Sequence, residues 1–323
     1  MQKNNFPYET AEYETIPCSF CEATDFEVLT KKDRNGLPVQ SVICTQCGLI
    51  YINPRMKKEW YEKYYEKEYR EQMARFKGDD RTNDYTDEYQ FEQAVKRGEL
   101  FLERIGSYVR AGLTIDVGSS AGGILHAFKK QLGVAVLGIE PSQEEADLAN
   151  KMGIKTIVSM FENLDEEIPL ADNVLSFRSL NHMLEPRAFF EWANTQLKPG
   201  GRLLLEVMNF VGTFGEYKSL HQATQIDHVY MFSKDALKHV LENLGFRVLV
   251  VEDSDELHCY IVAEKVAECN PEQDKLQDPE ICKKTVKEIK SMTDSYPRYF
   301  LKYGRKRFFK KIKYKLKRLF KKS

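Results

Sequence analysis

Short apolar runs alternate with segments of helical periodicity from Leu113 to about Glu264. This alternation is typical of βαβ units on a mainly parallel sheet, and helices are expected after the first, second, fourth and fifth runs. The last two runs have no helix between them, so they predict an antiparallel hairpin at one edge. The pattern thus predicts an α/β fold with a seven-stranded sheet, its strands at 113–117, 134–139, 154–158, 173–178, 201–207, 246–252 and 258–263.

The regions on either side of this pattern differ in character. Apolar residues spaced three and four apart between Phe91 and Ile105 predict a helical connector. A polar, helix-compatible linker follows the last strand. Five parts are expected: 1–55 with two cysteine pairs, the connector 56–110, the α/β domain 111–265, the linker 266–300 and the tail 301–323.

Four of the seven cysteines form two Cys-x-x-Cys pairs. Cys18 and Cys21 are separated from Cys44 and Cys47 by 22 residues that carry turn signals. Two such knuckles can bring four thiolates onto one zinc ion, and a four-thiolate site leaves no open position for substrate. The spacing predicts a zinc ribbon whose metal is structural.

Composition and charge narrow the class of protein. The chain is 42% hydrophobic and 30% charged, which is typical of a globular protein. Its beginning lacks the apolar core of a signal peptide. We therefore expect a cytoplasmic protein.

The formal net charge of −1 hides a strong asymmetry. Residues 301–323 contain twelve basic and no acidic residues, which leaves 36 basic against 49 acidic residues before them. Apolar residues recur within this tail at helical spacing and predict a basic amphipathic helix. Such a helix suits an anionic membrane surface, here the inner face; nucleic acid binding and a solvated tail stay open as alternatives. The apolar residues are Phe309, Ile312, Leu316, Leu319 and Phe320.

A loop of small residues follows the first strand of the α/β pattern. The strand ends near Asp116, and Gly118, Ser120 and Gly122 lead into a helix, so a ligand can approach the backbone there. Glu140 ends the second strand, 24 residues beyond Asp116, where a carboxylate typically binds a ribose diol. Nicotinamide and S-adenosylmethionine cofactors share this arrangement, although the loop lacks a clean Gly-x-Gly-x-x-Gly.

Several short motifs appear in order along the chain: CSFC, CTQCGLIYINPR, GIEPS, HMLEP, LKPGG and LLEVMN. Together they resemble the class I S-adenosylmethionine-dependent methyltransferases that carry an amino-terminal zinc-ribbon segment and modify sugars or surface polysaccharides. The resemblance covers residues 16 to about 263 and implies a Rossmann-like fold.

The resemblance also implies roles for individual residues. It places Glu140 at the ribose of the cofactor and the Met160–Phe161 segment at the adenine. Such loops usually have glycine where this chain has Ser120. The residues implied to line the methionine part are Asp116, Gly118, Ser120 and Gly122.

Two histidines are candidates for acid–base chemistry. His182 follows the fourth strand, at the edge where open α/β sheets bind ligands, and matches the histidine of a Glu-His pair in the family, although Asn181 precedes it here. His228, with Asp227 adjacent, resembles a histidine on the substrate side. Packing roles are the alternative for both.

The expected function is transfer of a methyl group from S-adenosylmethionine to a small or saccharide-type acceptor, as sugar O- or C-methylation in a glycan pathway. Two alternatives remain open. One is an RNA methyltransferase, and the other is a non-catalytic scaffold that contains zinc.

Overall fold

The structure is a computed structural model that describes residues 7–67, 87–164, 167–217, 219–269 and 273–299. A seven-stranded sheet with the order β12-β13-β10-β9-β6-β7-β8 forms its larger part. The five strands from β10 to β8 run parallel, and β13 lies antiparallel to both β10 and β12. This confirms the predicted α/β sheet and its edge hairpin. The strands are β6 (Leu113–Val117), β7 (Ala135–Glu140), β8 (Thr156–Val158), β9 (Ala171–Phe177), β10 (Leu197–Met208), β12 (Phe246–Asp253) and β13 (His258–Lys265).

Strand β10 is longer than the predicted 201–207. It begins at Leu197, which pairs with Ala171 of β9, and an irregularity separates this pair from the next one at Arg202. The predicted strand begins at Gly201, the last residue of the intervening Pro-Gly-Gly, whereas in the structure β10 continues through this run with a shift of register.

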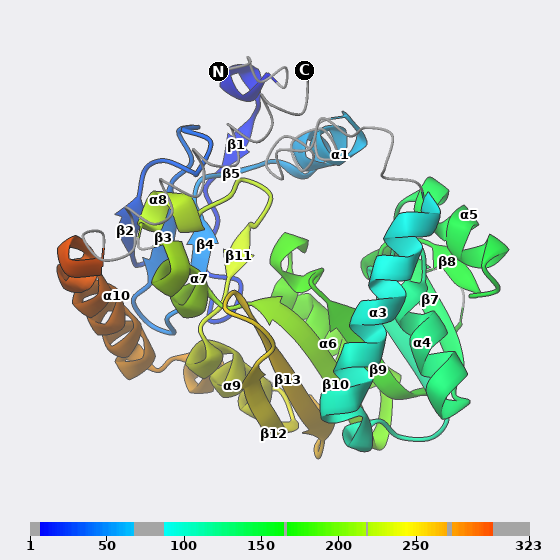
Figure 1. The fold of residues 1–323 in the computed structure, drawn as a ribbon. Coiled ribbons are helices and arrows are strands. Elements are labelled where there is room, and N and C mark those ends of the chain that lie inside the picture. Colours follow the sequence, from blue (N-terminus) through cyan, green and yellow to red (C-terminus); the bar gives the residue numbers. More distant parts are fainter. Residues whose placement is uncertain (1–6, 68–86, 165–166, 218, 270–272, 300–323) are drawn as a thin grey trace.

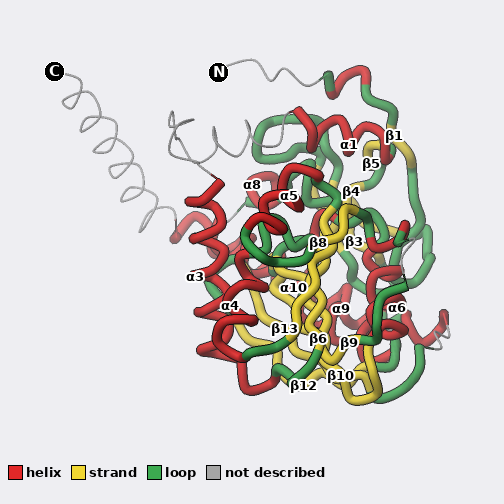
Figure 2. Tube along the Cα trace, turned by 90° about the vertical axis from the view of Figure 1, so that its right-hand side faces the viewer, coloured by secondary structure: helices red, strands yellow, loops and turns green. Residues whose placement is uncertain are grey.

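Helices cover both faces of the sheet (Figure 2). Side chains of successive residues in a strand point to opposite faces. Val174 accordingly packs in one buried cluster with residues of α6 and α9, whereas Leu175 packs in another with residues of α3 and α4. The helices are α3 (Asp87–Ile105), α4 (Gly123–Leu132), α5 (Gln143–Lys151), α6 (Pro186–Gln196) and α9 (Lys234–Asn243).

Local sequence explains where these helices begin. The hydroxyls of Ser142 and Ser233 accept hydrogen bonds from the backbone N–H three residues on, so they cap α5 and α9. Pro186 occupies the first turn of α6, where its missing N–H costs nothing. Gly98 lets α3 approach α4, because a Cβ there would lie 2.9 Å from the Cβ of Ala127.

A second, four-stranded sheet lies beside the first (Figure 1). Its order is β11-β4-β3-β2, and its edge strand β11 comes from the segment between β10 and α9. The cysteine-bearing region therefore shares a sheet with residues that follow it by about 180 positions. The strands are β2 (Phe26–Thr30), β3 (Ser41–Cys44), β4 (Ile50–Ile52) and β11 (Tyr230–Met231), with β1 (Tyr13–Glu14) and β5 (Arg55–Met56) paired separately.

Four further helices belong to the described structure: α1 (Lys58–Lys67), α7 (Phe210–Tyr217), α8 (Leu220–Ala223) and α10 (Pro279–Tyr299). Helix α10 falls in the predicted linker 266–300, and it packs on the four-stranded sheet through buried Cys282 and Ile289. A Cβ on Gly48, whose φ is +73°, would lie 2.7 Å from Ile281. Residues 279–299 thus form part of the folded body.

The tail 301–323 lies outside the described residues, so its amphipathic helix stays a prediction. None of the described helices is both long and apolar enough to span a membrane.

Candidate active site

The small-residue loop after β6 has the backbone conformation that a close ligand approach requires. Gly118, Ser120 and Gly122 all have positive φ, at 77°, 48° and 77°. A Cβ on Gly118 would lie 2.4 Å from the hydroxyl of Ser179, so only glycine fits there. Ser120 is held in its left-handed conformation by two bonds: its N–H donates to Glu140 at 2.8 Å and its hydroxyl donates to Glu145 at 2.9 Å.

Glu140 lies where the sequence predicts, at the carboxyl end of β7. Its two oxygens accept backbone N–H groups of Ser120 and Ser142, at 2.8 and 3.0 Å. The side chain is 8% exposed, and burial raises its pKa. A carboxylate has about four lone-pair sites, so two remain for a ligand hydroxyl pair.

Asp116 differs from Glu140 because nothing compensates its burial. It is 1% exposed, and its Oδ1 has no hydrogen-bond partner in the described part of the chain. Burial, and secondarily the charge of Glu140, raise the pKa of Asp116 to about 8. A buried acidic group without a partner beside a left-handed loop suits a ligand that carries positive charge, as S-adenosylmethionine does.

The segment expected at the adenine has two different side chains. Phe161 is buried and packs against Phe189 and Trp192, with ring centroids 5.7 and 5.8 Å away. Met160 is half-buried and caps the short helix η3 (Phe161–Asn163). Of the two, Met160 has the side chain that packing leaves more accessible.

The two candidate histidines lie together. Their ring centroids are 4.7 Å apart at 83°, and Asp227 completes a group whose ligand atoms lie within 4.8 Å of one another. His182, in η4 (Leu180–His182), contacts the backbone carbonyl of Asp227 through Nδ1 at 2.8 Å. Burial lowers the pKa of His228 to about 3, so this ring is neutral at neutral pH.

The segment that carries Asp227 and His228 is held by the cysteine-bearing sheet. Every residue from Thr224 to Val229 is buried. The N–H of Arg34 donates to the carbonyl of Thr224 at 3.0 Å, and the N–H of Ile52 donates to that of Val229 at 2.9 Å. The amino-terminal region therefore forms one wall of the candidate site.

Two residues of that wall escaped the sequence analysis. Asp33 and Arg34 directly precede Asn35-Gly36, a sequence that indicates a turn and gives no sign of a functional site. Asp33 is fully buried, with its pKa raised to about 6 by burial, and the charge of Arg34 interacts with Asp227. Asp33 is buried and Arg34 is half-buried, and this burial becomes apparent only when the turn packs against the segment of Asp227.

The four cysteines of the two pairs converge, as predicted. The sulfurs of Cys18 and Cys47 lie 3.4 Å apart, those of Cys21 and Cys44 lie 3.6 Å apart, and all four residues are buried and free of disulfides. Four thiolates about 2.3 Å from a tetrahedral zinc would be separated by about 3.8 Å. The donor set and its spacing fit a structural zinc ion.

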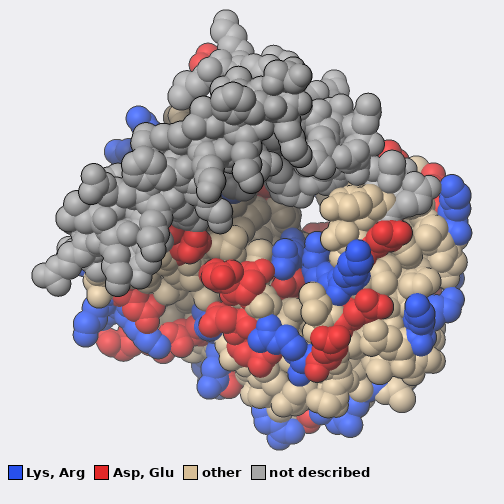
Figure 3. Space-filling view, in the orientation of Figure 1, with Lys and Arg blue, Asp and Glu red and all other residues tan. Residues whose placement is uncertain are grey.

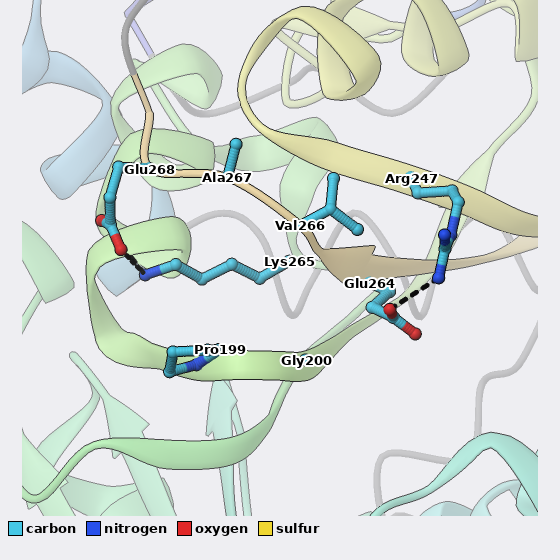
Figure 4. Close-up of a pocket in the computed structure, with 8 residues that line it drawn as sticks. All are labelled: Pro199, Gly200, Arg247, Glu264, Lys265, Val266, Ala267 and Glu268. Carbon is cyan, nitrogen blue, oxygen red and sulfur yellow. Dashed lines mark hydrogen bonds and ion pairs between the residues drawn. The ribbon is translucent and has the colours of Figure 1, made fainter.

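A shallow pocket lies elsewhere, beside the start of β10 and the end of β13 (Figure 4). Its charged side chains pair with one another: Lys265 with Glu268 at 3.1 Å and Arg247 with Glu264 at 2.7 Å. Parallel strands of α/β sheets bind ligands at their carboxyl ends, and this pocket lies at the opposite edge. The candidate site is therefore the loop and the histidine cluster.

Comparison with known families agrees with this geometry. A family model described as a methyltransferase domain matches residues 61–251, more than half of the chain. The chain belongs to this methyltransferase family. Its fold and membership support a class I enzyme that depends on S-adenosylmethionine, and the loop and acidic residues above fit that cofactor.

Two relatives align with this methyltransferase over part of its length. An uncharacterized protein of Methanocaldococcus jannaschii, MJ1123, is 26% identical over 153 residues, which cover 45% of this chain and 70% of that protein. The C-methyltransferase NovU of Streptomyces niveus is 30% identical over 164 residues, which cover 49% of this chain and 38% of NovU. The match thus spans well under half of NovU.

Solved structures resemble the methyltransferase as well. The plantazolicin methyltransferase BpumL, in complex with a monoazolic desmethylPZN analogue and S-adenosylhomocysteine, aligns with a TM-score of 0.48 and 12% identity. The alignment covers 64% of this chain and 93% of BpumL.

Proposed function

We propose that this methyltransferase transfers a methyl group to an oxygen or carbon atom of a small or saccharide-type acceptor in a glycan pathway. The observation that carries the proposal is the group of His182, Asp227 and His228, in which His182 lies three residues after Ser179, whose hydroxyl donates to the carbonyl of Gly118 in the cofactor loop. Partial similarity to a C-methyltransferase is consistent with a carbon acceptor.

His182 is suited to accept the acceptor's proton. A carbonyl oxygen only accepts hydrogen bonds, so the contact with Asp227 implies that Nδ1 of His182 carries the hydrogen. In the neutral ring, Nε2 then carries the lone pair. His182 is 23% exposed, which leaves the ring within reach of an acceptor.

His228 is suited to a different role. A ring with a pKa of about 3 is a weak base at neutral pH, because general bases act best when their pKa lies near the working pH. Its Nδ1 lies 3.2 Å from the sulfur of Met208. We assign His228 to positioning, as a neutral ring packed edge-on against His182.

The cofactor supplies an electrophilic methyl group on a sulfonium sulfur. Around it, Glu140 is proposed to bind the ribose, the loop at Gly118, Ser120 and Gly122 to line the methionine part with Asp116, and Met160–Phe161 to line the adenine. The fit rests on two observations: the unpartnered Asp116 and the two remaining acceptor sites on Glu140.

We also propose that Cys18, Cys21, Cys44 and Cys47 bind one zinc ion with a structural role. The supporting observation is the spacing of 3.4 and 3.6 Å between buried, reduced sulfurs. Since the same sheet holds the segment of Asp227 and His228, the metal would support the acceptor site from a distance.

The tail 301–323 is proposed to bring the enzyme to the inner face of an anionic membrane. Support comes from the sequence, in which twelve basic residues flank an apolar stripe. Co-sedimentation with anionic vesicles should require both Lys/Arg and Phe309, Leu316 and Phe320. RNA binding stronger than vesicle binding at physiological salt would contradict this.

The acceptor class is tested by incubating the enzyme with methyl-labelled S-adenosylmethionine and, separately, nucleotide-linked sugars and transfer RNA. Label should enter the sugar fraction, and His182→Gln should lower kcat strongly while the dissociation constant for S-adenosylhomocysteine stays unchanged. Label in RNA alone would overturn the proposal. Figure 3 shows acidic and basic side chains intermingled over the described residues of this face. Proteins that bind RNA typically have a continuous basic surface instead.

A further inference from the structure

A second polar cluster lies at the carboxyl ends of β9 and β10, built around Arg178. This residue has a φ of 60° and directly follows β9. Its Nε and Nη2 donate to the two oxygens of Glu206 at 2.9 and 2.8 Å, and Nη2 also contacts Asp255 at 3.3 Å. Glu206 is 1% exposed. Both carboxylates of the cluster are thus engaged by Arg178.

Arg97 reaches the same cluster from α3. Residues 97, 101 and 104 share one helix face, and Phe101 packs on Phe177 and Tyr260 with ring centroids 4.5 and 5.0 Å away. That face therefore covers the carboxyl end of β9. Arg97, one turn before Phe101, is half-buried and makes no hydrogen bond or ion pair within the described ranges.

The environment of Arg97 is unfavourable for its charge. Burial lowers the pKa of Arg97, and the nearby Arg178 lowers it further, whereas the charges of Glu206 and Asp255 act in the opposite direction. A guanidinium has five N–H donors in a planar fork that matches carboxylate and phosphate oxygens. Because Glu206 and Asp255 are already bound to Arg178, the donors of Arg97 are available to an anion from outside the chain.

This cluster adjoins the candidate active site. Ser179, the residue after Arg178, donates its hydroxyl to the carbonyl of Gly118 at 3.2 Å. His182 follows three residues later. One run of five residues therefore connects the Arg178 cluster, the cofactor loop and the candidate base.

We propose that Arg97 binds a carboxylate- or phosphate-type anion of one of the two reactants. The inference rests on the proposed function in one respect: it takes the methyl donor and the methyl acceptor to be the two reactants. Two sources offer this chemistry: the carboxylate of the cofactor's methionine part and an anionic group on the acceptor.

Calorimetry with two ligands tests the cofactor as source. S-adenosylhomocysteine and its decarboxylated analogue are titrated into the wild type, Arg97→Gln and the control Lys96→Gln, which removes one exposed charge from the same helix. If the anion is the cofactor carboxylate, Arg97→Gln weakens the first ligand by about tenfold or more, as expected for a lost charge-assisted bond, and leaves the analogue unchanged. Arg97→Met, which removes the charge but keeps a long side chain in the half-buried position, replaces the Gln variant if that variant fails to fold.

Inorganic phosphate, followed by ³¹P line broadening, tests the acceptor as source. If the anion belongs to the acceptor, phosphate binds the wild type saturated with S-adenosylhomocysteine, and Arg97→Gln weakens it about tenfold while Lys96→Gln does not. The proposal is overturned if Arg97→Gln matches Lys96→Gln in both experiments. A wild type that binds no S-adenosylhomocysteine contradicts the proposed function instead, and phosphate titrated alone then decides the role of Arg97.

Discussion

Replacing Asp116 by asparagine should stabilise the free methyltransferase at neutral pH while weakening its site. The pKa of this carboxyl is about 8 in the folded protein against an ordinary value of 3.8. At pH 7 the folded chain keeps the proton that the unfolded chain has lost. About three pKa units separate pH 7 from the unfolded value, so the burial costs about 4 kcal/mol of folding free energy.

The substitution recovers only part of this cost. Asparagine carries no charge, but its amide would be buried where Oδ1 of Asp116 already has no partner, which costs about 1–3 kcal/mol. The expected net gain at pH 7 is thus about 1–3 kcal/mol in the free energy of unfolding.

The pH dependence is the sharper test. Between about pH 4 and pH 8 the folded state binds more protons than the unfolded state at this site, so wild-type stability falls as pH rises. The variant lacks this contribution, and its stability advantage over the wild type should grow by about 3 kcal/mol from pH 5 to pH 7.

Urea unfolding at several pH values, with free zinc held constant, measures both quantities. The comparison of the two proteins at each pH removes contributions from other titrating groups. A variant that is less stable than wild type at pH 7, or a difference that does not change between pH 5 and pH 7, would refute the reasoning.

Three further predictions concern ligands. Glu140→Gln should weaken S-adenosylhomocysteine binding by roughly tenfold to a hundredfold in calorimetry, whereas Glu144→Gln, at an exposed position, should not; equal losses would contradict the ribose contact. Binding of S-adenosylmethionine at pH 7 should release up to one proton, because its positive charge favours ionised Asp116, and buffers of different ionisation enthalpy should detect no such release in Asp116→Asn. Elemental analysis should find about one zinc per chain, and Cys44→Ser should abolish it; unchanged zinc would exclude the site.

The sheet could be predicted because its signals are local. Apolar runs such as 113–117, with the turn residues that follow them, predict a strand and its end from a few consecutive positions. The place of Glu140 was predicted from its distance in sequence from Asp116. The cysteine pairs also needed only their spacing. Each of these signals lies within one element or a short stretch of chain.

The walls of the site could not be predicted because they depend on contacts between distant segments. Arg34 reaches Asp227 across about 190 residues, and Arg97 approaches Arg178 from another helix. No periodicity marks such pairs. These charged side chains become buried only when the elements pack against one another. The sequence pattern around each residue therefore does not predict their burial.

The pairing of β11 with β4 has a consequence for synthesis on the ribosome. The outer edge of β4 at Tyr51 is covered only after Tyr230, about 180 residues later in the chain, has been synthesised. At the usual 5–20 residues per second, that edge stays open for roughly 10 to 40 s. An uncovered strand edge can pair with other chains, so this nascent protein passes through an interval in which a chaperone has a specific surface to protect.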